Sequence, residues 1–220
     1  MILTHTGKLG DFFPCLTISN YYYKNGGERT TFVLTSWFKQ FNGLQELLMR
    51  QPCVEGIIFD PYSAPAWGLG GTDYKFKPAH ITDELYYNLG MNQWPIMYLG
   101  ELYASEYNLN CDKDISLNFL YDSFPDELKG KKLYTKWDEK STRADSDRYD
   151  REYRGQLEEQ GFEPFDTTKP LLYNLNLAHY ASEVKMFPEG FSVLADMARI
   201  KFTLQNNSVN PKVYYIHHTD

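Results

Sequence analysis

The sequence predicts an α/β protein made of two small halves, each a parallel sheet covered by helices, and two observations support this. Within the first 60 residues, short β-branched or apolar runs alternate with helical patterns in the order βαβαβ, which favours parallel strands joined by right-handed crossovers. The alternation begins again after Gly130, beyond a stretch at 122–130 that we interpret as a hinge or linker. We therefore expect two Rossmann-like domains, 1–125 and 126–220, that face each other across a cleft.

The elements of the first half follow from local signals. The runs TTFVLTS at 30–36 and VEGIIFD at 54–60 are rich in β-branched or apolar residues, which is typical of buried strands. A helix that begins at Asp11 is expected to end at Asn25-Gly26-Gly27, because Asn and Gly adopt the left-handed conformation of a C-terminal cap. The Gly-, Pro- and aromatic-rich segment 61–77 is interpreted as a loop over the functional edge of the sheet. The expected strands are 1–5, 30–36, 54–60 and 96–99, and the expected helices are 11–24 and 43–51.

The second half repeats the pattern with shorter elements. A polar loop, DEKSTRADSDR, separates its first strand from a charged amphipathic helix. The expected strands are 131–137, 161–165 and 184–187, and the expected helices are 149–160, 171–181 and 190–198. The two halves are thus similar in plan rather than in sequence.

Composition bounds the kind of protein. A chain of 220 residues with 42% hydrophobic content can bury a sizeable core. Its formal net charge of −7 gives no support to a general electrostatic grip on nucleic acid, although it does not exclude one. The three cysteines are odd in number and widely spaced, so we expect no disulfide framework and a reducing, cytoplasmic setting.

The sequence shows neither a targeting signal nor a membrane-spanning segment. The start of the chain reads as a short strand rather than as a signal peptide, and no run approaches the roughly 20 apolar residues of a membrane helix. We therefore expect no membrane span.

The stretch THTGKLGDFFP at 4–14 is the first candidate site. Gly7 and Gly10 lie where a strand passes into a helix, and the free N–H groups and helix dipole there favour negative charge. Asp11 is expected to be the N-cap, with Pro14 in the first helical turn. From these residues alone, Asp11 is either a cap without a catalytic role or part of a site.

The pattern GKLGDFFP resembles the first turn of the heptosyltransferase-like glycosyltransferases of the GT-B fold, in which two Rossmann-like domains flank a cleft. The resemblance covers Met1 to about Tyr23. It implies a nucleotide-activated sugar as co-substrate, no resident cofactor, and transfer to an acceptor hydroxyl with inversion. It also implies that Asp11 is the base that deprotonates the acceptor.

The second half is similar to a GT-B C-terminal domain over EEQGFEPFD and the following LLYNLNLAHYASEVKMFPEGFSVLADMARI. The resemblance implies that its last turn, with Glu189, Gly190 and Ser192, holds the donor diphosphate at a helix N-terminus, an arrangement that the helix dipole favours. The alternative is that Glu189 and Ser192 are ordinary capping residues.

Further candidates lie in loops. Hydroxyl donors and a bidentate guanidinium suit a phosphate, so the charged loop of the second half adds donor-binding candidates, although it can equally be a solvated run of charges. Those candidates are Lys136, Ser141, Thr142 and Arg143. Aromatic rings that could stack on acceptor or sugar are Trp37, Trp67 and Tyr74, and Trp37 is alternatively a core residue.

No metal is expected. The five histidines show no ligand spacing with the cysteines or carboxylates. No D-x-D set is clearly placed after a strand, and the set at 145–147 lies in a charged loop. The sequence-based hypothesis is a metal-independent inverting glycosyltransferase whose acceptor is a glycan, a small molecule or a modified base. The alternatives are a non-catalytic nucleotide or nucleotide-sugar binding module, and a hydrolase or deoxyribosyltransferase on one continuous flavodoxin-like sheet.

Overall fold

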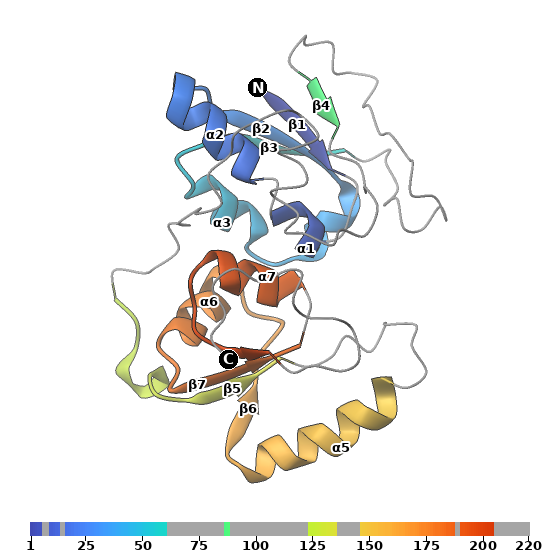
Figure 1. Cartoon of the computed structure of the whole chain (residues 1–220), viewed down its shortest axis with the longest axis vertical. Coiled ribbons are helices and arrows are strands. Elements are labelled where there is room, and N and C mark those ends of the chain that lie inside the picture. Colours follow the sequence, from blue (N-terminus) through green and yellow to red (C-terminus); the bar gives the residue numbers. More distant parts are fainter. Residues whose placement is uncertain are drawn as a thin grey trace.

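The computed structural model describes residues 1–5, 9–13, 16–60, 86–88, 123–135, 146–187 and 190–204. These residues form two four-stranded sheets whose paired strands are all parallel, one in each half of the chain, with helices between them (Figure 1). The α/β class and the division into two sheets, both expected from the sequence, are confirmed.

The first sheet has the strand order β3-β2-β1-β4. Its strands are β1 (Ile2–His5), β2 (Thr30–Thr35), β3 (Val54–Asp60) and β4 (Tyr86–Asn88). The first three strands match the expected ones closely. Their apolar side chains, such as Leu3, Phe32 and Leu34, are fully buried, as expected for strands inside a sheet covered by helices. Strand β4 was not expected, and the strand expected at 96–99 lies outside the described residues.

Two helical segments stand where one long helix was expected. The helices of this half are α1 (Leu9–Phe12), α2 (Leu16–Gly26), the 3-10 helix η2 (Ser36–Gln40) and α3 (Leu44–Met49). Because α1 begins at Leu9, the prediction that Asp11 is the N-cap is wrong, and Asp11 is the third residue of α1. The early start buries Leu9 together with Phe12 and Phe13, which lie three and four residues further on.

The C-terminal cap of α2 is confirmed. The helix ends at Gly26, and Gly27 has a φ of +71°, the left-handed conformation expected from the sequence. Pro14 lies outside the described residues.

The second sheet has the order β6-β5-β7-β8. Its strands are β5 (Lys132–Tyr134), β6 (Phe162–Pro164), β7 (Glu183–Met186) and β8 (Thr203–Leu204). Its helices are η4 (Asp126–Leu128), α5 (Ser146–Glu159), α6 (Leu171–His179) and α7 (Gly190–Met197). Only β8 and the short η4 were not expected.

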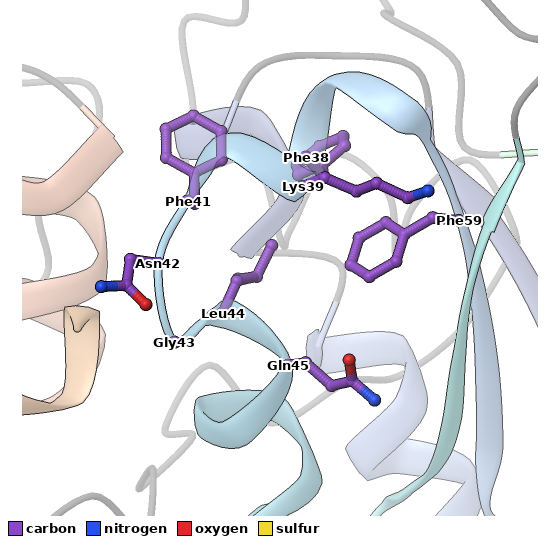
Figure 2. Close-up of a pocket in the computed structure, with 8 residues that line it drawn as sticks. All are labelled: Phe38, Lys39, Phe41, Asn42, Gly43, Leu44, Gln45 and Phe59. Carbon is purple, nitrogen blue, oxygen red and sulfur yellow. The ribbon is translucent and has the colours of Figure 1, made fainter.

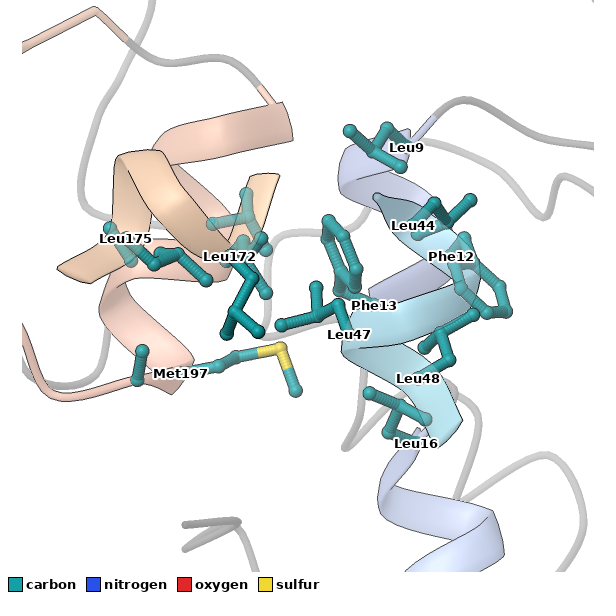
Figure 3. Close-up of a cluster of buried hydrophobic side chains, with 14 of the residues drawn as sticks. Leu9, Phe12, Phe13, Leu16, Leu44, Leu47, Leu48, Leu172, Leu175 and Met197 are labelled. Atoms are coloured by element: carbon teal, nitrogen blue, oxygen red, sulfur yellow. The ribbon is translucent and has the colours of Figure 1, made fainter. Parts of the chain in front are cut away.

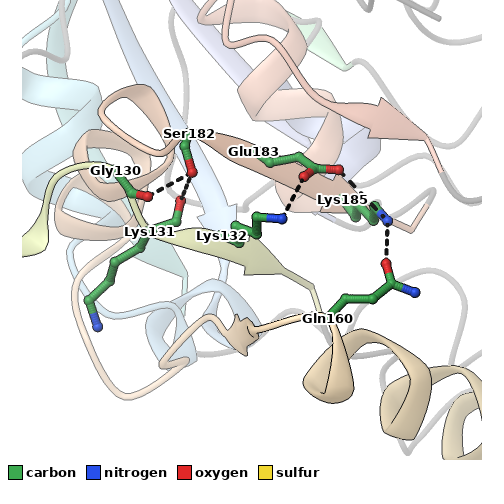
Figure 4. Close-up of polar contacts among 7 residues, drawn as sticks. All are labelled: Gly130, Lys131, Lys132, Gln160, Ser182, Glu183 and Lys185. Atoms are coloured by element: carbon green, nitrogen blue, oxygen red, sulfur yellow. Dashed lines mark hydrogen bonds and ion pairs between the residues drawn. The ribbon is translucent and has the colours of Figure 1, made fainter.

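The described part of the expected linker is bound to the second half. Phe124 is buried and stacks on Tyr180, with ring centroids 5.4 Å apart and planes at 14°. The Ser182 hydroxyl donates to the carbonyls of Gly130, at 2.7 Å, and Lys131, at 3.2 Å (Figure 4). Residues 124–131 are therefore held against the second half by ring stacking and hydrogen bonds.

One hydrophobic core runs through both halves. Helix α1 packs against α7 and α3 against α6, so that Phe13 and Leu47 of the first half face Leu172 and Met197 of the second (Figure 3). A smaller cluster of buried side chains lies between α5 and the second sheet. Helix α5 lies on the side of this sheet that is remote from the first half (Figure 1). Where the described residues of the two halves meet, apolar side chains therefore fill the space between them.

None of the helices among the described residues is long and apolar enough to cross a membrane.

Candidate active site at the junction of the two halves

The candidate site follows from the order of the strands. In the first sheet the connections reverse direction between β1 and β4, and in the second between β5 and β7. Ligands of open parallel sheets bind beyond the carboxyl ends of strands at such reversal points. Gly10 and Asp11 follow β1 and Gly190 follows β7, so these three predicted site residues come soon after reversal-point strands.

The backbones of Gly10 and Gly190 are in contact. A Cβ atom added to Gly10 would lie 3.2 Å from the Gly190 Cα, and one added to Gly190 would lie 3.0 Å from both the Gly10 nitrogen and the Leu9 Cβ. Only glycine at both positions allows this approach without displacement. Two turns that the sequence analysis selected separately as candidate sites therefore meet in the fold.

A buried hydrogen bond at Phe187, three residues before the start of α7, holds the chain that leads into this helix. The Phe187 N–H donates to the Thr135 hydroxyl at 2.8 Å, which ties the residue after β7 to the residue after β5. Sequence reasoning missed Thr135, although a hydroxyl directly after a short strand is a recognisable signal. Because the first N–H groups of a helix lack partners within it, the eight-residue α7 presents donors at this end.

Ser192 lies in the first turn of α7, and its side chain is fully buried. Ser192 is enclosed by the folded chain, where it interacts with another group of the protein. Its part in donor binding stays a prediction, and the backbone of this turn is the portion of α7 best suited to meet an anion.

Asp11 is placed by its backbone only. It belongs to α1, which packs directly on α7, so the predicted base lies at the junction and within one turn of the contact between the two glycines. The side chain of Asp11 lies outside what the structure describes. The other predicted site residues outside the described residues are Lys136, Ser141, Thr142, Arg143, Glu189, Trp67 and Tyr74.

Trp37 belongs to an aromatic cluster of the first half. Its ring meets those of Phe38 and Phe41, with centroids 5.2 Å and 4.6 Å apart, and the residue packs against the core. This environment agrees with the alternative that Trp37 is a core residue. A contact between Trp37 and an acceptor stays a prediction.

A pocket of about 400 Å³ lies beside this cluster, at the carboxyl ends of β2 and β3 (Figure 2). Phe38, Phe41 and Phe59 contribute aromatic surface, and Lys39 extends across Phe59 with its ammonium 6.0 Å from the ring centroid. No local pattern in the sequence predicts this pocket, because only the folding of the sheet brings residues 38–45 and residue 59 together.

Two further observations concern titratable groups. Burial raises the pKa of the Cys53 thiol above its ordinary value, and the neighbouring Ser19 only partly offsets this. Among the residues that the structure describes, no three His, Cys, Asp or Glu side chains cluster as a metal site would require. A metal-independent reaction stays a prediction.

No protein-family model and no curated protein sequence matches the chain. Solved structures do match, over 99% of its length. The E. coli heptosyltransferase WaaC with ADP aligns at a TM-score of 0.60 and 14% identity, with 91% of that chain covered.

The chain has the fold of the heptosyltransferase structures, the GT-B fold. A glycosyl transferase family 9 structure from Veillonella parvula DSM 2008 aligns at a TM-score of 0.59 and 10% identity, with 84% of that chain covered. The iron-containing dodecameric glycosyltransferase TibC from enterotoxigenic E. coli H10407 gives 0.59 and 15%, with 61% covered. The heptosyltransferase fold, inferred above from the first turn and the second-half pattern, is thereby confirmed.

Proposed function

We propose that the protein is a glycosyltransferase that moves a sugar from a nucleotide-activated donor to an acceptor hydroxyl. The observation that carries the proposal is the contact between Gly10 and Gly190, which brings together the helices that follow two reversal-point strands. The likeness to heptosyltransferase structures along 99% of the chain supports it.

The donor diphosphate is assigned to the start of α7. Free N–H groups and the positive end of the helix dipole offset its charge, and charge on the leaving diphosphate grows as the glycosidic bond breaks. Lys136, Ser141, Thr142 and Arg143 are proposed to add donors from the loop after β5, and Glu189 and Ser192 to complete the turn before and within α7.

The acceptor is assigned to the first half. Asp11 is proposed to accept the proton of the attacking hydroxyl, so that the hydroxyl oxygen attacks the anomeric carbon from the face opposite the diphosphate and the configuration inverts. The ligands in the solved structures suggest where to begin: WaaC is bound to ADP in one structure and to ADP-2-deoxy-2-fluoro heptose in another, and TibC is in complex with ADP-D-beta-D-heptose. An adenosine diphosphate sugar is therefore the first donor to test.

Calorimetric titration with ADP, UDP, GDP, CDP and dTDP tests the binding step, and a product assay with the matching sugar donor tests the chemistry. We expect one nucleoside diphosphate to bind more tightly than the others and its sugar donor to be consumed. Addition of EDTA is expected to leave turnover unchanged, and a loss would contradict metal independence. Binding without consumption of any donor would instead favour a nucleotide-sugar binding module.

A further inference from the structure

The pocket at the ends of β2 and β3 combines aromatic side chains with polar groups and one cation. Phe38 and Leu44 are fully buried or nearly so and form its floor, while the half-buried rings of Phe41 and Phe59 remain partly open to solvent. Lys39 is exposed and reaches over Phe59 (Figure 2). Its volume of about 400 Å³ falls within the roughly 300–1,000 Å³ of small-molecule sites.

The Lys39 ammonium is available to a ligand. Among the described residues no carboxylate forms an ion pair with it, and the Phe59 ring is its recorded contact. The lysines of the second sheet differ: Lys132 and Lys185 lie 3.5 Å and 3.8 Å from oxygens of Glu183 (Figure 4). A ligand anion that meets Lys39 would therefore not have to displace a carboxylate of the described chain.

The aromatic side chains of the pocket suit a flat ring. Each sugar hydroxyl needs a hydrogen-bond partner when it is buried, and the pocket side chains able to supply one are Lys39, Asn42 and Gln45. The Asn42 amide already donates to the Thr168 carbonyl at 2.9 Å. Aromatic rings, in contrast, gain from edge-on or offset contact with another ring as well as from the burial of apolar area.

The pocket is also rigid on the side that faces the second half. The Leu171 N–H donates to the Asn42 carbonyl at 2.8 Å, and a Cβ atom on Gly43 would lie 2.7 Å from the Pro170 Cβ. A binding surface that is already ordered loses less conformational entropy when a ligand arrives.

We propose that this pocket binds a small organic anion that carries a flat apolar ring, with the ring against Phe59 and the anionic group at Lys39. The binding itself does not depend on sugar transfer. The further assignment, that the pocket holds a ring-bearing anionic group of the acceptor, rests on the proposed function.

Three probes separate the two parts of the interaction. 2-Naphthoate carries both ring and charge, 2-naphthamide keeps the ring without the charge, and acetate keeps the charge without the ring. In calorimetric titrations we expect naphthoate to bind about three- to fivefold more tightly than naphthamide, the worth of one half-exposed ion pair, and acetate not to bind measurably. Amide resonances of residues 38–45 and 59 are expected to shift in NMR spectra.

Variants then assign the contacts. Lys39→Met is expected to remove the preference for naphthoate over naphthamide, and Lys201→Met, a change at an exposed lysine outside the pocket, to leave it intact. Phe59→Leu is expected to weaken both aromatic probes. Absence of naphthoate binding, an unchanged preference in Lys39→Met, or resonance shifts confined to other residues would each overturn the proposal.

The same samples distinguish this proposal from the proposed function. ADP titrated into the Lys39→Met protein is expected to bind as it does to the unmodified chain. If naphthoate binds as described but no nucleotide does, the ring-and-anion pocket stands and the transfer proposal fails; the reverse result removes the pocket alone.

Discussion

Gly10 of α1 and Gly190 of α7 approach each other so closely that a single added methyl group on either would press on the backbone of the other, at 3.2 Å and 3.0 Å. The two residues are 180 positions apart in the chain, and their contact joins the helix that follows β1 to the helix that follows β7. This contact sets how the predicted base and the predicted diphosphate turn lie relative to each other.

Replacement of Gly190 by alanine is expected to lower the free energy of unfolding by about 1–3 kcal/mol, because the new Cβ must displace packed atoms of α1. Chemical denaturation measures the change. Gly155→Ala in α5 is the matched control: its Cβ meets open space, and alanine in a helix interior should raise stability by about 0.5–1 kcal/mol. Equal effects in the two variants would mean that the contact does not exist in solution.

Gly43→Ala is expected to cost more. Gly43 has a φ of +77°, which alone costs an L-residue about 1–2 kcal/mol, and its Cβ would lie 2.7 Å from the Pro170 Cβ. Gly161 has a φ of +82° with nothing within 4 Å of its added Cβ, so Gly161→Ala isolates the backbone cost. The difference in unfolding free energy between the two variants measures the contact of α3 with the second half, and no difference would refute it.

Asp11→Asn tests the proposed base. We expect kcat for sugar transfer to fall by about 10²–10⁴-fold, because the amide cannot accept the proton of the attacking hydroxyl, while the melting temperature stays nearly constant. Glu159→Gln, at an exposed position in α5, serves as the control for loss of a carboxylate. A large loss of stability with intact turnover would instead assign Asp11 a purely structural role.

The buried Cys53 thiol predicts a pH effect on stability. Its pKa is raised in the folded state, so the folded chain keeps this proton to higher pH than the unfolded chain does. The contribution is complete below the ordinary thiol pKa of about 8.5 and is lost as the pH rises towards the folded-state value, by at most about 1.4 kcal/mol per pH unit. The test is the difference in unfolding free energy between the unmodified chain and Cys53→Ala from pH 7.5 to 10. A difference that is constant or increases with pH would contradict this expectation.

Much of the fold was predictable because it is written in short-range patterns. The strands at 30–35 and 54–60 follow from runs of β-branched and apolar residues, and the end of α2 follows from consecutive glycines. Strand β4 was missed, because Tyr86–Asn88 is a three-residue strand defined by its pairing with β1 rather than by a pattern of its own.

The start of α1 shows where local reasoning failed. An Asp after a Gly is a good N-cap, yet the helix begins two residues earlier, at Leu9. Burial of Leu9 in the core that the two halves share outweighs the cap, and that core involves side chains such as Val193 from the other end of the chain. Propensity at a helix end is worth about 1 kcal/mol, and burial of a leucine is worth more.

The sequence by itself determined the α/β class, the two alternating halves, most element boundaries and the glycine-containing turns, since each depends on neighbours within a few residues. Only the tertiary structure decided that Gly10 touches Gly190, that Thr135 fixes the approach to α7, and that three phenylalanines and Lys39 enclose a pocket. These relations join residues that only the folding of the sheets brings together, and the close packing that creates them depends on shapes that no local pattern records.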